Sequence, residues 1–290
     1  MKISEIIKNN KVTVSFEVFP PKEWAKLEDT KAVIKEMVKD NPAFMSVTYG
    51  AGGTTSGFTT EIAKEVLQGG VSPLSHLTCF TSTKEKINSV LDELETNGVE
   101  NILALRGDIP KDYAESPNQH YHHAGELVAE IKARGGFCVG GACYPEIHPE
   151  SKNRVEDLAH LKEKVDCGLD FLTTQMFFDN EAFYNFREMC AIKEINVPII
   201  AGIMPITNAK QIKRSVELSN CSLPRKFEKI MERFGENPDV MKQAGIIYAT
   251  EQIIDLMANG VNNIHIYTMN KPDVAHQIMK GLSAIVNEQN

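Results

Sequence analysis

A unit of one strand followed by one helix recurs along this chain at intervals of about 30 residues, and this repeat restricts the fold more than any other feature. Apolar patterns predict strands at residues 12–18, 44–50, 74–80, 101–108, 137–144, 171–178, 197–205 and 264–268. Helical spacing predicts helices at 24–40, 58–67, 84–95, 124–133, 155–165, 181–192 and 274–286, with further helical patterns between 206 and 259. Such alternation is typical of a parallel sheet, which either closes into a barrel or stays open between helices.

The two faces of the predicted strands differ in polarity, and this difference separates the two folds. In the first strand Phe16 and Val18 share one face, while Ser15 and Glu17 share the other. Pairs of polar residues recur on one face of later strands: Ser46 and Thr48, His76 and Thr78, Arg106 and Asp108, Thr173 and Gln175, His265 and Tyr267. An open sheet packs helices on both faces and should be apolar on both. We therefore predict an α/β fold, a single-domain (β/α)8 TIM barrel over residues 1–290, whose polar residues gather at the C-terminal mouth.

Composition restricts the partners and the location of the protein. A net charge of −8, from 31 basic and 39 acidic residues, disfavours an extended phosphate-binding surface, so we expect no nucleic-acid partner. No apolar run reaches membrane-spanning length and the first residues lack a signal-peptide core, so we expect no membrane association and a cytoplasmic protein. The six cysteines include no C-x-x-C pair, which predicts buried free thiols.

Glu17 stands at the C-terminal end of the first predicted strand, just before Phe19, Pro20 and Pro21. Neither proline can donate to a strand ladder, so the pairing should end there. If the apolar neighbours remove water from the carboxyl group, its pKa rises and it can act as a general acid near neutral pH. The alternative is a glutamate at a strand end that simply faces solvent.

Several common catalytic patterns are absent from the sequence. There is no H-E-x-x-H pair, no G-x-S-x-G turn, no phosphate-binding glycine–lysine loop and no G-x-G-x-x-G turn. The run His120, Tyr121, His122 and His123 lies in a polar loop and is interpreted as solvated surface. The sequence therefore predicts no metal site.

Six short segments, each at or near a predicted strand end, resemble the methylenetetrahydrofolate reductases in order and spacing. They are residues 15–21 (SFEVFPP), 46–50 (SVTYG), 76–79 (HLTC), 104–108 (ALRGD), 144–150 (YPEIHPE) and 267–270 (YTMN). The resemblance implies a barrel that binds FAD without a covalent link and follows a ping-pong cycle. In such a cycle reduced nicotinamide, NADH or NADPH, donates electrons, and 5,10-methylenetetrahydrofolate becomes 5-methyltetrahydrofolate for one-carbon metabolism and methionine synthesis.

The same resemblance implies roles for individual residues. Glu17 would give the proton that opens the folate ring, and Asp108 would act beside the flavin and the pterin; the alternative for Asp108 is a structural ion pair with Arg106. The implied FAD-binding residues are Thr48, Tyr49, Ala51, His76, Arg106, Gly107, Asp108, Ala124, Tyr144, His148, Asp157 and Lys164. The implied folate-binding residues are Gln175, Gln211, Tyr267 and Lys271.

Two positions depart from the family pattern. Ser215 stands where some relatives carry an aromatic residue, and Lys271 where some carry arginine. The first departure leaves the electron donor open among NADH, NADPH and a partner redox protein. We also expect a homo-oligomer without the regulatory domain of eukaryotic relatives. Two alternatives remain: a pterin-binding barrel that transfers a methyl group without redox chemistry, and a folate-binding subunit of a larger complex.

Overall fold

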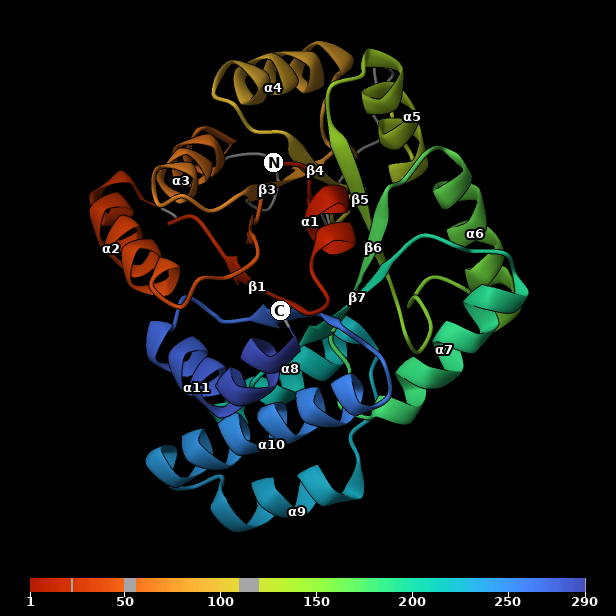
Figure 1. The fold of residues 1–290 in the computed structure, drawn as a ribbon. Helices are drawn as coiled ribbons and strands as arrows, with labels where there is room; N and C mark the ends of the chain where they lie inside the picture. Colours follow the sequence, from red (N-terminus) through yellow and green to blue (C-terminus); the bar gives the residue numbers. More distant parts are fainter. Residues whose placement is uncertain (22, 50–55, 110–119, 290) are drawn as a thin grey trace.

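In the computed structural model, which describes residues 1–21, 23–49, 56–109 and 120–289, eight parallel strands pair in chain order and close into a barrel (Figure 1). The strands are β1 (Thr13–Val18), β2 (Met45–Val47), β3 (Pro73–Thr78), β4 (Asn101–Leu105), β5 (Cys138–Cys143), β6 (Phe171–Thr174), β7 (Ile199–Ile203) and β8 (Asn263–Tyr267). Closure comes from β1, which pairs with both β2 and β8. The predicted (β/α)8 barrel is therefore confirmed.

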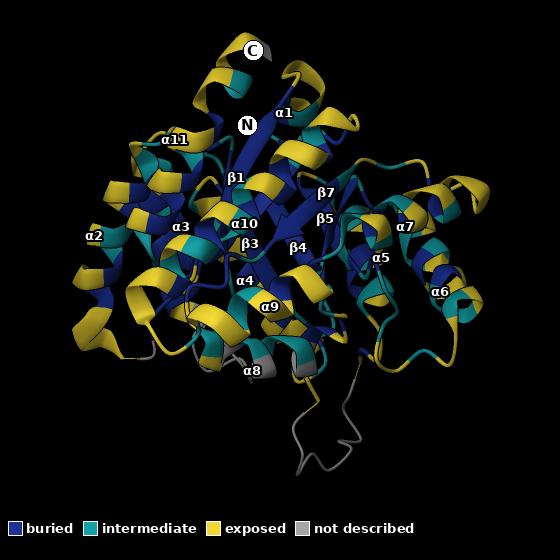
Figure 2. Ribbon diagram, turned by 90° about the horizontal axis from the view of Figure 1, so that it is seen from below, coloured by how far each residue is buried: buried dark blue, intermediate teal, exposed yellow. Residues whose placement is uncertain are grey.

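A ring of helices surrounds the strands, and Figure 2 shows the buried strands inside it. The helices of the ring are α2 (Leu27–Val38), α3 (Ser56–Gln68), α4 (Lys84–Thr96), α5 (Ala124–Arg134), α6 (Arg154–Asp166), α7 (Asn180–Ile192), α8 (Ala209–Ser219), α9 (Arg225–Phe234), α10 (Pro238–Ala258) and α11 (Pro272–Gln289). A 3-10 turn, η1 (Trp24–Lys26), precedes α2. None of the helices in the described ranges is long and apolar enough to cross a bilayer.

Alternation along the strands divides the barrel into an outer and an inner apolar cluster. Residues of one parity, such as Phe16 and Val47, pack against the surrounding helices. Residues of the other parity point inward, where Phe44, Leu74 and Phe171 form part of a separate cluster near the N-terminal ends of the strands. The inward positions nearer the C-terminal ends are polar, so the barrel has an apolar floor and a polar mouth.

A short helix that the sequence analysis did not predict, α1 (Ile3–Asn9), covers this floor (Figure 1). Ile3 and Ile6 are buried and join the inner cluster. Seven residues with two buried positions one turn apart are too short a pattern to separate from a loop. Helices of this length gain most of their stability from tertiary packing.

Asn101, the first residue of β4, ties α1 to the barrel. Its Oδ1 accepts a hydrogen bond from the backbone N–H of Ile3 at 2.8 Å. Its Nδ2 donates to the carbonyl oxygens of Met1 and Pro73, both at 3.1 Å. The side chain is buried, so its loss would leave buried backbone groups without partners.

We expect Asn101→Ala to lower the free energy of unfolding by about 2–5 kcal/mol, since at least two buried groups lose a hydrogen bond worth roughly 1–3 kcal/mol each. Urea unfolding followed by circular dichroism measures the change. Asn97→Ala is the matched control, because Asn97 is a C-cap whose amide bonds only to the Glu93 carbonyl near the surface. Equal losses for the two variants would show that α1 does not depend on Asn101.

Candidate active site

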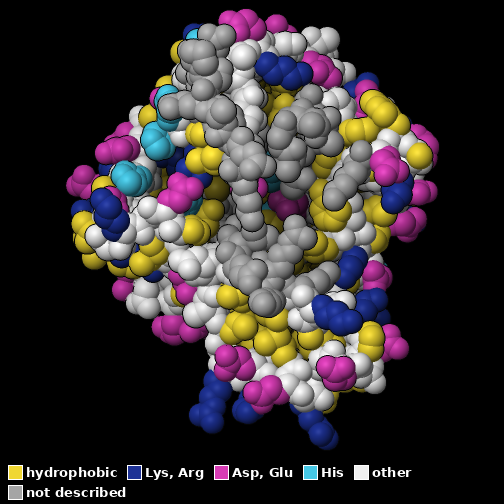
Figure 3. Space-filling model, turned by 180° about the vertical axis from the view of Figure 1, so that it is seen from behind, with side chains coloured by type: hydrophobic (Ala, Val, Ile, Leu, Met, Phe, Trp, Pro, Cys, Tyr) yellow, Lys and Arg dark blue, Asp and Glu magenta, His cyan; other side chains and the backbone are white. Residues whose placement is uncertain are grey.

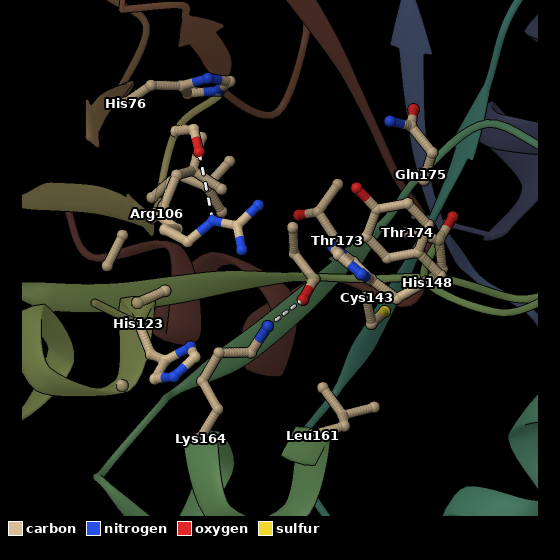
Figure 4. Close-up of a pocket in the computed structure, with 18 of the residues that line it drawn as sticks. His76, Arg106, His123, Cys143, His148, Leu161, Lys164, Thr173, Thr174 and Gln175 are labelled. Carbon is tan, nitrogen blue, oxygen red and sulfur yellow. Dashed lines mark hydrogen bonds between the residues drawn. The ribbon is translucent and has the colours of Figure 1, made fainter. Parts of the chain in front are cut away.

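A cavity of about 870 Å³ opens at the C-terminal ends of the strands and extends between β4, β5, α5 and α6. Glu17, Ser46, His76, His265 and Tyr267 line it from the barrel side. Lys164 lines it from α6, as Figure 4 shows. Figure 3 looks at the molecule from the side opposite to Figure 1, and histidine and acidic side chains gather along one side of that face.

Most of the residues singled out from the sequence meet in this cavity. Those that line it are Glu17, Thr48, His76, Arg106, Gly107, Asp108, Ala124, Tyr144, His148, Asp157, Lys164, Gln175 and Tyr267. Tyr49 does not line it, because it continues the outward parity of β2 and is buried in the cluster behind the strand. Lys271 is not among the residues that line the cavity, and its ammonium group donates to Thr207 Oγ1 at 2.7 Å. Ala51 and the side chain of Gln211 lie outside the described part of the chain.

Arg106 reaches the cavity by a route that differs from the prediction. The sequence analysis placed Arg106 on the inward parity of its strand, but the inner cluster contains Leu103 and Leu105, so Arg106 has the opposite parity. The strand ends at Leu105, and Gly107, with φ of +85°, turns the chain. A Cβ at Gly107 would lie 2.9 Å from Thr78 Cβ, so this turn requires glycine both for its φ and for space.

The partner of Arg106 is Glu150, not Asp108. The guanidinium group donates two hydrogen bonds to the Glu150 carboxylate, at 2.5 and 2.6 Å. This bond raises the pKa of Arg106 and lowers the pKa of Glu150. Asp108 is exposed. The proposed ion pair between Arg106 and Asp108 is therefore wrong, because after the turn at Gly107 the guanidinium points toward the loop that follows β5.

Lys164 brings a second positive charge to the same part of the cavity. Its Nζ donates to the carbonyl oxygen of Ala142 at 2.5 Å, drawn as a dashed line in Figure 4. Burial lowers the pKa of Lys164, while Cys143 and Asp157 oppose that shift. In residues 120–123, the run interpreted as solvated surface, the three histidines are exposed but Tyr121 is buried, so that interpretation is wrong for Tyr121. His123 lines the cavity and is the N-cap residue of α5. Lys164 and Arg106 can donate to an anionic group at this end, although the Glu150 carboxylate already binds Arg106.

Glu17 lies at the other end, among two imidazoles and a hydroxyl group. Its Oε2 is 3.3 Å from Ser46 Oγ, 3.7 Å from His76 Nε2 and 3.9 Å from His265 Nε2. Burial alone would raise the pKa of Glu17, but His265, His76 and Ser46 together bring it below its ordinary value. The expected rise in the pKa of Glu17 is therefore wrong, because the polar neighbours outweigh desolvation.

His76 is a buried imidazole whose Nε2 has no hydrogen-bond partner within the described ranges. Burial is the main cause that lowers the pKa of His76, to about 4, against a smaller opposing effect of the Glu17 charge. The ring is therefore neutral at neutral pH, and His76 is one of the residues that line the cavity.

Glu150 and Cys143 are among the lining residues that were not identified from the sequence as part of the site. Glu150 belongs to the segment that also contributes Tyr144 and His148, but a glutamate in a loop gives no sign that it will pair with Arg106. Cys143 was expected to be a buried thiol, and it is one, yet it also lines the cavity. All six cysteines are free and five are buried.

The neutral state of His76 predicts a dependence of stability on pH. Since the pKa of His76 is about 4 in the folded protein and 6.5 ordinarily, the unfolded chain takes up the proton first as pH falls. Between pH 7 and pH 5 this should lower the free energy of unfolding by roughly 2 kcal/mol. His76→Gln should remove that part of the loss in urea titrations at the two pH values. His276→Gln, at an exposed site, should keep the wild-type loss, and an unchanged loss in His76→Gln would contradict the prediction.

Comparisons with known proteins identify the family. The sequence model of the methylenetetrahydrofolate reductase family matches residues 2–283. The 5,10-methylenetetrahydrofolate reductases of Escherichia coli and of Buchnera aphidicola from Schizaphis graminum are 33% and 36% identical, over 92% and 93% of this chain and 89% and 91% of theirs. Methylenetetrahydrofolate reductase (NADH) 1 of Arabidopsis thaliana is 35% identical over 98% of this chain, which spans half the length of that relative.

Solved structures agree on the fold. A Clostridium thermocellum protein described as binding two copies of 5-methyl-5,6,7,8-tetrahydrofolic acid aligns with a TM-score of 0.67 and 13% identity, over 99% of this chain and 100% of that one. Dihydropteroate synthase of Xanthomonas albilineans aligns with a TM-score of 0.53 and 12% identity, over 94% and 92%. At such identities the likeness concerns the barrel alone. The family match and the bacterial relatives, which extend over nearly the whole barrel, show that this chain belongs to the methylenetetrahydrofolate reductase family.

Proposed function

We propose that this chain reduces 5,10-methylenetetrahydrofolate to 5-methyltetrahydrofolate with FAD as its cofactor and reduced nicotinamide as the electron donor. The observation that carries the proposal is the polarity of the cavity. A carboxylate, Glu17, lies at one end, and two cations lie at the other: Lys164, and Arg106 in its pair with Glu150. The reaction needs a proton donor at one place, and a dinucleotide needs partners for its phosphates at another.

The residues present fit FAD by their chemistry. A cavity of about 870 Å³ lies toward the large end of the usual range for small-molecule sites. Arg106 and Lys164 would hold the pyrophosphate, and the unpaired Nε2 of His76 would meet a polar atom of the cofactor. When bound, FAD would carry the hydride from the donor to the folate.

Glu17 would serve as the proton donor for the folate. Ring opening of 5,10-methylenetetrahydrofolate requires a proton on the departing ring nitrogen, and Glu17 is the carboxyl group inside the barrel mouth. This group is an anion at neutral pH, because its pKa is lowered. It must therefore take up a proton before each turnover.

Gln175 and Asp108 would orient the substrate. Gln175 Oε1 accepts a hydrogen bond from the backbone N–H of Met176 at 2.9 Å, and this bond directs the amide N–H groups away from the backbone. Tyr267 donates its hydroxyl hydrogen to the Thr174 carbonyl at 2.5 Å, so its ring is fixed in the mouth. A Cβ at Gly202 would lie 2.4 Å from the Thr174 carbonyl oxygen and 2.7 Å from the Tyr267 ring, so glycine leaves the room for Tyr267.

Other expectations from the family stay predictions. These are the cytoplasmic location, the homo-oligomer, a partner redox protein as an alternative donor, the supply of methyl groups for methionine synthesis, and the roles of Lys271 and Gln211. Two measurements on the purified protein test the central proposal. A flavin spectrum after incubation with FAD, together with turnover of methylenetetrahydrofolate by the isolated chain, would support it. No uptake of FAD would leave a folate-binding barrel without redox chemistry.

Arg106→Ala should raise the dissociation constant for FAD at least about tenfold, since a charged contact with the pyrophosphate is lost at a cost of about 1.4 kcal/mol or more. Equilibrium dialysis or flavin fluorescence measures the constant. Arg134→Ala is the matched control, because Arg134 also forms ion pairs, with Asp92 and Glu95, but does not line the cavity. Equal affinity in the two variants would remove Arg106 from the cofactor site.

Glu17→Gln should separate the two halves of the catalytic cycle. The amide keeps the size of the side chain but cannot supply an acidic proton. Reduction by nicotinamide should stay within about tenfold of the wild-type rate, which is a change of about 1.4 kcal/mol in the barrier. Reduction of methylenetetrahydrofolate should fall at least about a hundredfold. Stopped-flow measurements of each half-reaction test this, and an equal slowing of both halves would exclude Glu17 as the proton donor.

A further inference from the structure

A line of close polar contacts crosses three strands beneath Glu17. Ser46 Oγ on β2 lies 3.3 Å from Glu17 Oε2 and 3.1 Å from His265 Nε2 on β8. On the far side of the ring, His265 Nδ1 lies 2.8 Å from Ser15 Oγ on β1. Ser15, Ser46 and His265 are all buried.

The surroundings of His265 can accept a hydrogen from both of its ring nitrogens. Ser15 Oγ lies 3.0 Å from the carbonyl oxygen of Ile264, to which it can donate its one hydrogen. With its hydrogen there, Ser15 accepts a hydrogen bond from His265 Nδ1 at 2.8 Å. The second nitrogen, Nε2, faces Ser46.

Ser46 has one hydroxyl hydrogen and two neighbours that can accept it. If His265 is an imidazolium, Nε2–H donates to Ser46, and Ser46 donates to the Glu17 carboxylate. If Glu17 is protonated, it donates to Ser46, and Ser46 donates to the neutral Nε2. The two arrangements contain the same number of protons and differ only in where the mobile one lies.

We propose that His265 stores the proton that Glu17 delivers to the folate and passes it to Glu17 through the Ser46 hydroxyl. The inference rests on the proposed function, since it names the source of the proton for that reaction. His265 is thus a positioning residue that acts through Glu17. Glu17 would thus receive its proton from His265 at the moment of reaction, and water would replace that proton between turnovers.

The transfer balances without any further reactant. The Nε2–H bond of His265 breaks as its proton binds Ser46 Oγ, and the original Ser46 hydrogen binds Glu17 Oε2. His265 becomes neutral and Glu17 becomes a neutral acid. When Glu17 then gives its proton to the departing nitrogen of the folate ring, it returns to the anion, and the next proton from water recharges the pair.

The other groups that face this pair do not compete for the proton. His76, from β3, lies 3.7 Å from Glu17, but burial lowers the pKa of His76 to about 4. Tyr267 lies edge-on to the His265 ring, at 5.3 Å between centroids, and burial raises the pKa of Tyr267 well above its ordinary value. Phe44 stacks on the ring at 5.9 Å, and the β7 residue beside His265 is Gly202, which has no side chain. The mobile proton therefore has two sites, His265 and Glu17.

The first test reads the proton directly in the resting protein. Nitrogen-15 NMR of histidine-labelled protein should show both ring nitrogens of His265 protonated at pH 7, with the signals assigned by their loss in His265→Gln. Glu17→Gln removes the anion 3.9 Å away, so the ring should then carry a hydrogen on one nitrogen at the same pH. Ser75→Ala, which removes a buried hydroxyl on β3 that is not in contact with this network, should leave the signals unchanged. A wild-type ring with a hydrogen on one nitrogen at pH 7 would overturn the proposal.

The second test uses the pH dependence of the folate half-reaction. His265→Gln keeps an amide that can bond to Ser46 but cannot store a proton, so Glu17 must then be protonated from water. Its rate should fall about tenfold for each pH unit between pH 6 and pH 8, while the wild-type rate changes less. Ser46→Ala, which breaks the line of contacts and keeps both ends, should show the same slope. Reduction by the nicotinamide donor should change less than about threefold in both variants.

The outcomes distinguish the relay from the function on which it rests. Wild-type pH profiles in His265→Gln and Ser46→Ala would reduce both residues to a structural role and overturn the relay. A protein with the expected NMR signals but no turnover of methylenetetrahydrofolate would instead remove the proposed function. If His265→Gln does not fold, His265→Asn assigns the NMR signals, and the profile of Ser46→Ala still tests the relay.

Discussion

The alternation of side chains along eight parallel strands is the constraint on which the rest of the structure depends. Each strand sends one set of residues toward the helices and the other set into the barrel. Inside the barrel, large apolar side chains such as Phe44 and Phe171 fill the end near α1. Polar side chains occupy the inward positions nearer the C-terminal ends of the strands. Because the strands are parallel, all polar ends meet at one mouth. The parallel arrangement of the strands is therefore enough to bring the polar side chains of the site together.

The balance of charges around Glu17 shows how this arrangement determines reactivity. Burial of a carboxyl group favours its neutral form, whereas neighbouring hydroxyl and imidazole groups favour the anion, and here the neighbours prevail. His76 is buried in the same layer but has no bonded partner in the described part of the chain, so its neutral form prevails. Glu17 and His76, 3.7 Å apart, thus differ in charge at neutral pH: Glu17 is an anion and His76 is neutral. The difference arises because their hydrogen-bond partners differ.

The sequence was sufficient for the fold because the barrel depends on repeated, local signals. Parity alone distinguished a closed barrel from an open sheet, and the predicted helices that surround it are present. Strand ends were less certain: β4 and β6 end at Leu105 and Thr174, earlier than their apolar runs suggested. An apolar run continues into a buried loop as readily as into a strand. The short helix α1 escaped notice for the opposite reason, since it is stabilised by contacts with the barrel floor rather than by its own pattern.

The site was predictable as a set of residues but not as a set of interactions. The family resemblance selected thirteen residues that line the cavity. It could not show that Arg106 bonds to Glu150, because that pair depends on the turn at Gly107. Nor could it give the direction of the pKa shift of Glu17, which depends on distances of 3.3–3.9 Å to groups on three other strands. Such distances are set only when the barrel has closed.

Closure itself joins the first and last strands of the barrel, β1 and β8, in register from Thr13 with Asn263 to Glu17 with Tyr267. This seam brings together segments about 250 residues apart, so it is among the slowest contacts to form by loop-closure entropy. The bond between Ser15 and His265 crosses the same seam. The contacts that join Ser15, Ser46, Glu17 and His265 therefore exist only in a chain whose first and last strands have paired.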